Sequence, residues 1–539
     1  MLKDSAKRFV KIGDNRVYDQ SFIFARVSEL IHSSRDISME DCLKTELAQY
    51  PPAYFDEDGK MRSTTKSKLT SSLAERVLER HMQVCDTKVY DVSALLWSIT
   101  WPQEGSHLKI FIQAFETFVI SALESANVIL VFDRYFDDSV KACQRLLRQE
   151  TEGLSRPYSL KPEMLVPPRS SILKVTQNKK QLNCLLAEAL LHPAFYTLAT
   201  QNGHTLTIAG VENYPIEINK GLKIDRRDIP SEHEEADPII AQMAILACIK
   251  GDVVLIVSED TDVFAITLHF YVTSECQQKM YMKSPKGHDL SDDRTVIDMK
   301  NTAEKHQELS KYILQLHALT GADCIPALFK VGKKRALNTL TCFKGGFFNP
   351  ANLSPVGDIF ADSDDVIFSG SKFLIGCYGK AYAQACNTMT EARIKIWRKK
   401  VASGPVRLSD IPPTNEAASE NIKRAHFQVA HWKTAIIGLP PKLDPEKYGY
   451  EPFKIASGTI LIPRPVPPGT KDAPDNVREM IHCGCEVSEC VGDRCRCKSI
   501  GCTRFCKCEA GPIYKNLFTK RMSEGEDEDE SFDLETFAD

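Results

Sequence analysis

The chain has 539 residues, of which 43% are hydrophobic, 26% charged and 8% aromatic. This composition is typical of a globular protein and excludes a wholly disordered chain, a collagen and a coiled-coil rod. At roughly 100–200 residues per domain, the length predicts about three domains. The formal net charge of −4, from 68 Lys and Arg against 72 Asp and Glu, does not by itself indicate a nucleic-acid partner.

Charge and cysteine are both unevenly distributed along the chain. Residues 524–539 contain nine acids and no base, which leaves 68 bases against 63 acids, a charge of +5, for residues 1–523. A tail of such composition is expected to be solvated and disordered. Eight of the 18 cysteines lie between Cys483 and Cys508. The two uneven distributions therefore indicate where function is to be sought.

Long apolar segments are absent from the sequence. The strongest apolar runs, 128–132 and 253–257, fall far short of the ~20 residues that a helix needs to span a bilayer. The N-terminal residues lack the apolar segment of a signal peptide. We therefore expect a soluble intracellular protein without a membrane partner, whose cysteines are reduced or bind metal.

Strands and helices alternate from about residue 85. Continuous apolar runs predict strands at 88–92, 127–133 and 251–260, and helical periodicity predicts helices at 107–125, 181–192, 235–249 and near 300–319. Alternation of this kind predicts an α/β fold with a parallel sheet covered by helices.

Changes in composition divide the chain into predicted regions. They are an N-terminal extension at 1–80, an α/β core at 85–345 with an insertion at about 151–230, a mainly helical region at 346–462, a Pro-rich linker at 463–480, a cysteine module at 481–510 and an acidic tail at 523–539. No role is predicted for residues 1–80 or 346–462.

Acidic residues follow the predicted strands and open the following helices. They are Asp91, Asp133, Asp260 and Asp262 at strand ends, Glu234, Glu235 and Asp237 at a helix start, and Asp323 at a turn after another helix. Because the carboxyl ends of parallel strands share one edge of a sheet, about seven carboxylates are expected to converge there. Such a cluster without cations would be strongly repulsive, so we predict two bound Mg²⁺ or Mn²⁺ ions. Any one of these acids taken alone could instead cap the helix that follows it.

The order of these acids resembles the PIN-like, flap-endonuclease (XPG-type) superfamily of metal-dependent nucleases. Asp91, Asp133, Glu235 with Asp237, Asp260 with Asp262, and Asp323 match the family's acids in turn, over roughly residues 85–345. The chain is also similar to uncharacterised, mobile-element-associated animal proteins with this core. The resemblance implies hydrolysis of DNA phosphodiesters and a helix–two-turn–helix element. An extra helical turn before Asp260 leaves either Glu234 or Glu235 as the ligand.

Basic residues gather in two places near the predicted acids. Residues 328–348 contain five bases and no acid, and Gly332 followed by Lys333, Lys334 and Arg335 could offer N–H groups and cations to a phosphate. The alternative is a plain solvated helix end. The resemblance implies that this element holds duplex DNA, and that Arg134, Lys141 and Arg145 hold the scissile phosphate. Aromatic residues at helical spacing, such as Trp432, and His317 are expected in the core.

The C-terminal cysteines have the spacing of a metal module. They are Cys483, Cys485, Cys490, Cys495, Cys497, Cys502, Cys506 and Cys508. So short a segment cannot bury a sufficient core, and reduced thiols this dense predict two or three Zn²⁺ ions. The spacing resembles a tesmin-type CXC repeat, a zinc module that binds DNA. The family's ninth cysteine is missing near Gly511 or Pro512, and its minor-groove Tyr is Arg494 here.

Together these features favour two hypotheses over a third, a purely structural interaction protein, which the zinc cluster and the matched acids together disfavour. The first is a metal-dependent DNA nuclease, selective for flaps or branched structures and delivered to DNA by the zinc module, with a nuclear location. The second is a DNA-binding or scaffold protein with the same core that no longer cleaves. The presence of every expected carboxylate favours the first.

Overall fold

The computed structural model describes residues 9–12, 15–18, 24, 27, 38–136, 139–142, 145, 157–285, 294–343, 345–455, 458–475 and 477. The chain divides into two compact units. The larger unit comprises residues 63–385 and 419–464, and the smaller comprises residues 1–62, 386–418 and 465–539. The eight clustered cysteines, Arg494 and the acidic tail lie outside the described residues.

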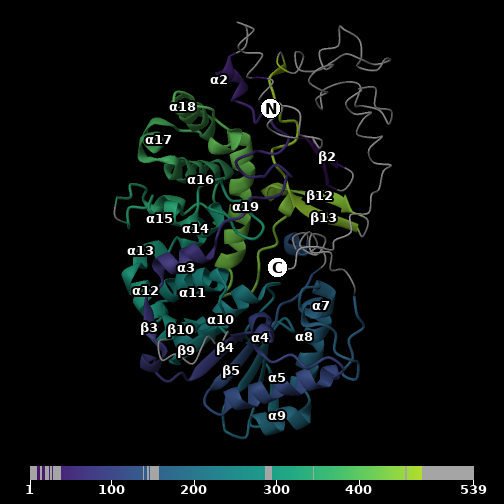
Figure 1. Cartoon of the computed structure of the whole chain (residues 1–539). Helices are drawn as coiled ribbons and strands as arrows, with labels where there is room; N and C mark the ends of the chain where they lie inside the picture. Colours follow the sequence, from purple (N-terminus) through teal and green to yellow (C-terminus); the bar gives the residue numbers. More distant parts are fainter. Residues whose placement is uncertain are drawn as a thin grey trace, which may run out of the picture. The chain divides into compact units, whose positions relative to one another are not determined.

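The larger unit is built on a mixed β-sheet. Among the described residues it has nine strands in the order β3-β11-β10-β9-β4-β5-β6-β7-β8. Figure 1 labels β3, β10, β9, β4 and β5 of this sheet. The central strands β10, β9, β4, β5 and β6 are parallel, and the strands at both edges are antiparallel to their neighbours. Their bounds are β3 Arg76–Leu78, β4 Thr87–Asp91, β5 Asn127–Val131, β6 Leu206–Ala209, β7 Ile216–Asn219, β8 Leu222–Asp225, β9 Val254–Val257, β10 Met280–Lys283 and β11 Thr295–Asp298.

Helices cover both faces of this sheet. Val128 and Leu130 of β5 belong to the same apolar cluster as Phe111 and Phe115 of α5 (Leu108–Leu123). Successive side chains of a strand point to opposite faces, and α10 (Ala236–Lys250) packs on β4, β5 and β9. Burial on both faces explains why β5 and β9 are continuous apolar runs.

Two buried helices begin at the carboxyl edge of the sheet. Helix α10 starts after Glu235 and ends at Gly251, whose left-handed φ of 105° terminates it. Helix α11 (Thr261–Thr273) starts after Asp260, follows β9 directly and packs against α10. Acidic residues at these helix starts are stabilised by the free N–H groups and by the helix dipole. The same residues are thereby held beside the ends of the parallel strands.

The remaining helices of the larger unit surround this core. They are α3 Ser67–Leu73, α4 Val92–Ser98, α7 Arg169–Leu173, α8 Thr176–Leu190, α9 Pro193–Ala199, α12 Met299–Lys305, α13 Gln307–Ser310, α14 Ile313–Leu319, α15 Lys333–Leu337, α16 Ser363–Tyr378, α17 Lys380–Ala385 and most of α19 Asn415–Lys433, with 3₁₀ turns at Glu79–His81, Pro350–Leu353 and Pro445–Tyr448. A hairpin of β12 (Tyr450–Ile455) and β13 (Gly458–Pro463) completes the unit.

The smaller unit has little regular structure among its described residues. It contains the hairpin β1 (Phe9–Ile12) and β2 (Asn15–Tyr18), helices α2 (Met39–Cys42) and α18 (Met389–Val401), and a 3₁₀ turn at Leu408–Asp410. The fully buried Arg393 of α18 lies 3.5 Å from Glu46 and donates to the Pro412 carbonyl. This buried ion pair joins α18 to the segment after α2.

The predicted fold class is confirmed, with differences in detail. The sheet is mixed rather than wholly parallel, and β6, from the predicted insertion at 151–230, pairs directly with β5. The N-terminal extension was expected to end at residue 80, but α3 and β3 belong to the larger unit. No helix among the described residues is long and apolar enough to cross a bilayer.

Candidate functional site

The predicted acids converge at the carboxyl edge of the sheet. Asp91 is the last residue of β4, Asp133 follows β5, and Asp260 follows β9. Asp91 accepts from the Ala94 N–H and caps α4, and Asp260 accepts from the Asp262 N–H at 2.8 Å and caps α11. Asp91 and Asp260 therefore do cap the helices that follow them, and they also converge with the other acids at this edge of the sheet.

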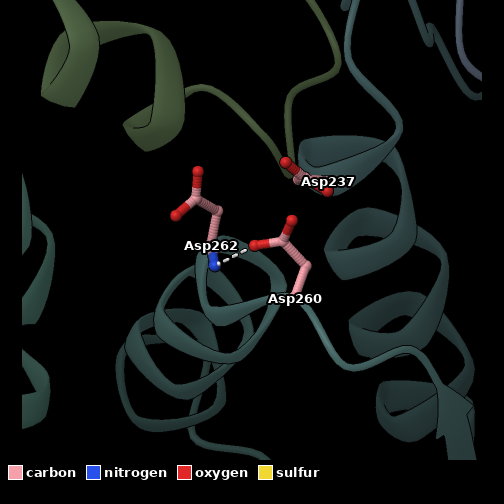
Figure 2. Close-up of side chains that lie close together, drawn as sticks. All are labelled: Asp237, Asp260 and Asp262. Atoms are coloured by element: carbon pink, nitrogen blue, oxygen red, sulfur yellow. Dashed lines mark hydrogen bonds between the residues drawn. The ribbon is translucent and has the colours of Figure 1, made fainter. Parts of the chain in front are cut away.

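Three of these acids lie closest together. One carboxylate oxygen from each of Asp237, Asp260 and Asp262 lies within 4.8 Å of the others. Figure 2 shows Asp237 on the first turn of α10 beside Asp260 and Asp262 at the start of α11. Small side-chain movements would bring these three oxygens onto one divalent cation, and oxygen is the ligand that Mg²⁺ and Mn²⁺ prefer.

A cleft of about 370 Å³ opens over the acids. Its lining includes six of the predicted acids and three of the predicted cations: Asp91, Asp133, Glu235, Asp237, Asp260, Asp323, Arg134, Lys141 and Arg145. Asp262 lies beneath this surface, with 1% of its area exposed. The cleft thus presents acids and bases together, as a site for a metal-bound phosphate requires.

Asp262 and Asp323 are held by cations. The Nζ atom of Lys66 lies 2.9 Å from Asp262 Oδ2 and 2.5 Å from Asp323 Oδ1, and His317 Nε2 lies 2.7 Å from Asp262 Oδ1. Burial alone would raise the pKa of Asp262, but the His317 hydrogen bond and Lys66 outweigh it and hold that pKa well below its usual range. The pKa of Asp323 is likewise lowered, because Lys141 and Lys66 outweigh the effect of burial.

Asp133 is also compensated. It accepts from Ser93 Oγ at 2.6 Å and from the Ala236 N–H at 3.1 Å, and Lys179 Nζ lies 3.7 Å away. Burial alone would raise its pKa, but Lys179 and these hydrogen bonds keep the pKa below its usual range. Asp133 thereby ties β5 to the start of α10.

The other acids carry charge that the protein does not neutralise. Burial, reinforced by the nearby Asp133 carboxylate, raises the pKa of Asp91 to about 6. Burial and the Asp262 charge raise the pKa of Asp260 to about 6, and burial and Asp260 raise that of Asp237 well above its usual range. Carboxylates in this state fit a divalent cation, which would relieve their desolvation and mutual repulsion.

The structure separates the two candidate glutamates. Glu234 is 2.5 Å from Arg145 Nη2 and accepts from Ser139 Oγ at 2.8 Å. Glu235 lines the cleft and is 2.5 Å from Lys141 Nζ, yet burial keeps its pKa raised. Glu235 rather than Glu234 therefore lies among the converging acids.

The predicted basic turn has one side chain in an unexpected place. Lys333 is 1% exposed, and its ammonium donates to the carbonyls of His317 and Gly321, at 2.5 and 2.6 Å, and to Thr320 Oγ1 at 2.9 Å. The expectation that this ammonium offers a charge to phosphate does not fit, because it is enclosed by these acceptors. Lys334 and Arg335 are exposed.

A second cleft, of about 480 Å³, lies at this turn. It is lined by Thr64, Thr65, Lys68, Gly332, Lys333, Lys334, Arg335 and Asn338. Two segments distant in sequence, the approach to α3 and the start of α15, therefore form one surface with exposed cations.

Sequence reasoning missed several residues of the acidic site. Lys66, Lys179, Ser93 and Ser258 carried no motif, and Ser258 Oγ donates to Asp91 Oδ2 at 3.1 Å. His317 was expected in the core and is indeed buried, but it also binds Asp262. A polar, lysine-containing stretch before α3 was the only signal for Lys66.

No protein-family model and no curated protein matches the sequence. Among solved structures, the catalytic core of Rad2 in complex with a DNA substrate matches at 12% sequence identity with a TM-score of 0.30. The match covers 70% of this chain and 96% of that chain.

Proposed function

We propose that this protein is a Mg²⁺- or Mn²⁺-dependent phosphodiesterase that cleaves DNA, with flaps or branched structures as substrates. The observation that carries the proposal is the convergence of acids from separate strands and helices, with oxygens of Asp237, Asp260 and Asp262 within 4.8 Å. Desolvation and mutual repulsion raise the pKa of Asp237 and Asp260, and carboxylates crowded in this way are costly unless they bind cations.

The chemistry follows from the residues around the cleft. Divalent cations bound by these carboxylates would activate a water and stabilise the leaving oxygen of a phosphodiester. Lys141, Arg145 and Arg134 line the same cleft and supply charges that can hold the phosphate in place. Ser93 and Ser258 orient Asp133 and Asp91 by donating hydrogen bonds to them.

Two further features support a nucleic-acid substrate. The cleft at α15 offers Lys68, Lys334 and Arg335, which suit contacts to backbone phosphates. The sequence of residues 481–510 supports a zinc module with two or three ions, in which Arg494 could enter a narrow minor groove. A DNA substrate would in turn favour a nuclear location.

A second candidate function is DNA binding without cleavage. One observation favours it: the ammonium groups of Lys66 and Lys141 already lie within 4.0 Å of Asp262, Asp323 and Glu235. If these contacts excluded cations altogether, the core would bind DNA but not hydrolyse it. Cleavage assays with Mg²⁺ or Mn²⁺ distinguish the two functions.

The test compares the wild type with an Asp260→Asn/Asp262→Asn variant on labelled flap, duplex and single-stranded DNA and on RNA, with Mg²⁺ or Mn²⁺. The matched control is Asp362→Asn/Asp364→Asn, because Asp362 caps α16 and accepts from the Asp364 N–H at the same 2.8 Å. Asn also caps helices well, so each variant keeps its cap.

We expect the wild type and the control to cleave, and the site variant to lose at least 100-fold in rate. Binding of DNA by the wild type without any cleavage would select the second function. Equal cleavage by wild type and site variant would reject the site.

A further inference from the structure

Lys66 brings a cation from the N-terminal part of the chain into the acidic site. It immediately precedes α3, and its side chain is 23% exposed, against 2% for Asp262. Its ammonium lies between Asp262 Oδ2 and Asp323 Oδ1, at 2.9 and 2.5 Å. Nothing in the motif of acids anticipates a lysine at this point.

The position of Lys66 is fixed by packing. Leu69 and Leu73 of α3 are buried, α3 packs against α11, and Thr70 Oγ1 lies 3.4 Å from Thr261 Oγ1. Helix α3 therefore packs on the helix that carries Asp262, and this packing places the Lys66 ammonium beside Asp262 Oδ2 and Asp323 Oδ1.

The cluster is divided into a neutralised half and an open half. In the part of the chain that the structure describes, no lysine, arginine or histidine nitrogen lies within 4.0 Å of a carboxylate of Asp91, Asp237 or Asp260. The carboxylates of Asp262, Asp323 and Glu235 all have such a partner. Asp262 lies at the boundary, since it also belongs to the close group with Asp237 and Asp260.

We propose that the Lys66 ammonium takes the place of a second divalent cation, so that the site binds one ion tightly, at Asp237, Asp260 and Asp262. This inference rests on the proposed function and specifies its metal stoichiometry. It differs from the two ions expected from the sequence.

Steric and electrostatic reasons make the two occupants exclusive. A divalent ion bound to Asp262 Oδ2 and Asp323 Oδ1 would lie about 2.1 Å from each oxygen. Lys66 Nζ already lies within 2.9 Å of the same two atoms, so an ion there would overlap it and repel its charge. A second ion therefore binds only when Lys66 swings out towards solvent.

The test counts the Mn²⁺ ions bound by the full-length, zinc-loaded protein. Isothermal titration calorimetry measures binding directly, and the electron paramagnetic resonance signal of free Mn²⁺ falls as ions bind. Thiolates prefer zinc to Mn²⁺, so the cysteines do not obscure the count. We compare the wild type with Lys66→Met, with Lys66→Arg, which keeps the charge, and with Lys109→Met. Lys109 is an exposed lysine that pairs with Glu163 at 3.1 Å and lines neither cleft, so it serves as the matched control.

We expect one tight Mn²⁺ in the wild type, in Lys66→Arg and in Lys109→Met. We expect two in Lys66→Met, with the second ion bound at least tenfold more tightly than in the wild type. Two tightly bound Mn²⁺ ions in the wild type would by themselves overturn the inference. An unchanged stoichiometry in a folded Lys66→Met, judged by its melting curve, overturns it as well.

These results are separable from the proposed function. A wild type that cleaves DNA and binds two tight ions contradicts only the role of Lys66. A wild type that binds no Mn²⁺ and cleaves nothing contradicts both.

Discussion

The Nε2 atom of His317 lies 2.7 Å from Oδ1 of Asp262, and both side chains are buried. Burial lowers the pKa of His317 to about 4, so the ring is neutral at pH 7 and its Nε2–H donates to the ionised carboxylate. The ring stacks on Trp432, with centroids 5.5 Å apart and planes at 12°. His317 thereby orients Asp262 through its Oδ1 atom, while Lys66 contacts its Oδ2 atom.

Replacing His317 is therefore expected to weaken cation binding. His317→Phe keeps a ring against Trp432 but removes the donor, and the loss of such a supporting hydrogen bond typically costs 10–100-fold in metal affinity. His317→Gln keeps an N–H donor and is expected to lose less. Mn²⁺ titration measures both. A wild-type affinity in His317→Phe would show that Asp262 needs no orienting partner.

The raised pKa of Asp260 predicts a pH-dependent effect on stability. Its folded pKa of about 6 exceeds the ordinary value of 3.8, so the folded state holds the proton more tightly. The acid is protonated in both states below about pH 4, and its destabilising effect develops as pH rises through 6. Asp260→Asn should therefore stabilise the protein at pH 7.5 without added divalent ions, and much less at pH 4.5.

Chemical unfolding at the two pH values measures this difference. Asn retains the helix cap, so the change isolates the charge. Asp362→Asn, at the exposed cap of α16, is the control and should have a small effect. An Asp260→Asn variant that is less stable than the wild type at pH 7.5 contradicts the prediction.

Only some of this site could be read from the sequence. Asp91, Asp133 and Asp260 were predictable because each follows an apolar strand, and the carboxyl ends of parallel strands meet at one edge. Lys66 was not, because its contact with Asp262 spans 196 residues and depends on how α3 docks. No local sequence pattern predicts a contact between residues so far apart in the chain.

The fold shows the same division between local and long-range information. Continuous apolar runs identified β5 and β9, since both faces are covered. The pairing of β6 with β5, and of β3 with β11, depends on the order of strands in space. His317 was placed in the core correctly, but burial alone does not say which polar group it meets.

The basic turn that contains Lys333 was predicted from the sequence, but the direction of the Lys333 side chain was predicted wrongly. Its buried ammonium donates to the carbonyls of His317 and Gly321. Lys333→Met would leave these acceptors without a donor, and we expect a loss of about 1–3 kcal/mol in unfolding free energy. Lys334→Met, at the exposed neighbouring position, should change it by less than about 0.5 kcal/mol. If both variants changed the free energy of unfolding in urea equally, the Lys333 side chain would be exposed to solvent rather than buried.

The exposed cations of α15 should affect DNA affinity rather than stability. Lys334→Ala/Arg335→Ala is expected to weaken binding about equally across sequences and to reduce the salt dependence of binding by about two ion equivalents. Lys399→Ala/Lys400→Ala removes the same charge from exposed positions on α18 and serves as the control. Fluorescence anisotropy at several salt concentrations measures both variants. Equal losses would indicate a general charge effect rather than a contact at α15.

The cysteine cluster predicts zinc in the full-length protein. The sequence of residues 483–508 contains eight thiols in a short stretch, the pattern typical of zinc ligands, so we expect at least two Zn²⁺ per chain by elemental analysis. Cys485→Ser/Cys497→Ser should lower the zinc content by at least one ion. Cys184→Ser/Cys342→Ser, which replaces two exposed cysteines elsewhere, should leave it unchanged. Less than one zinc per wild-type chain would contradict the zinc module, whatever the acidic site does.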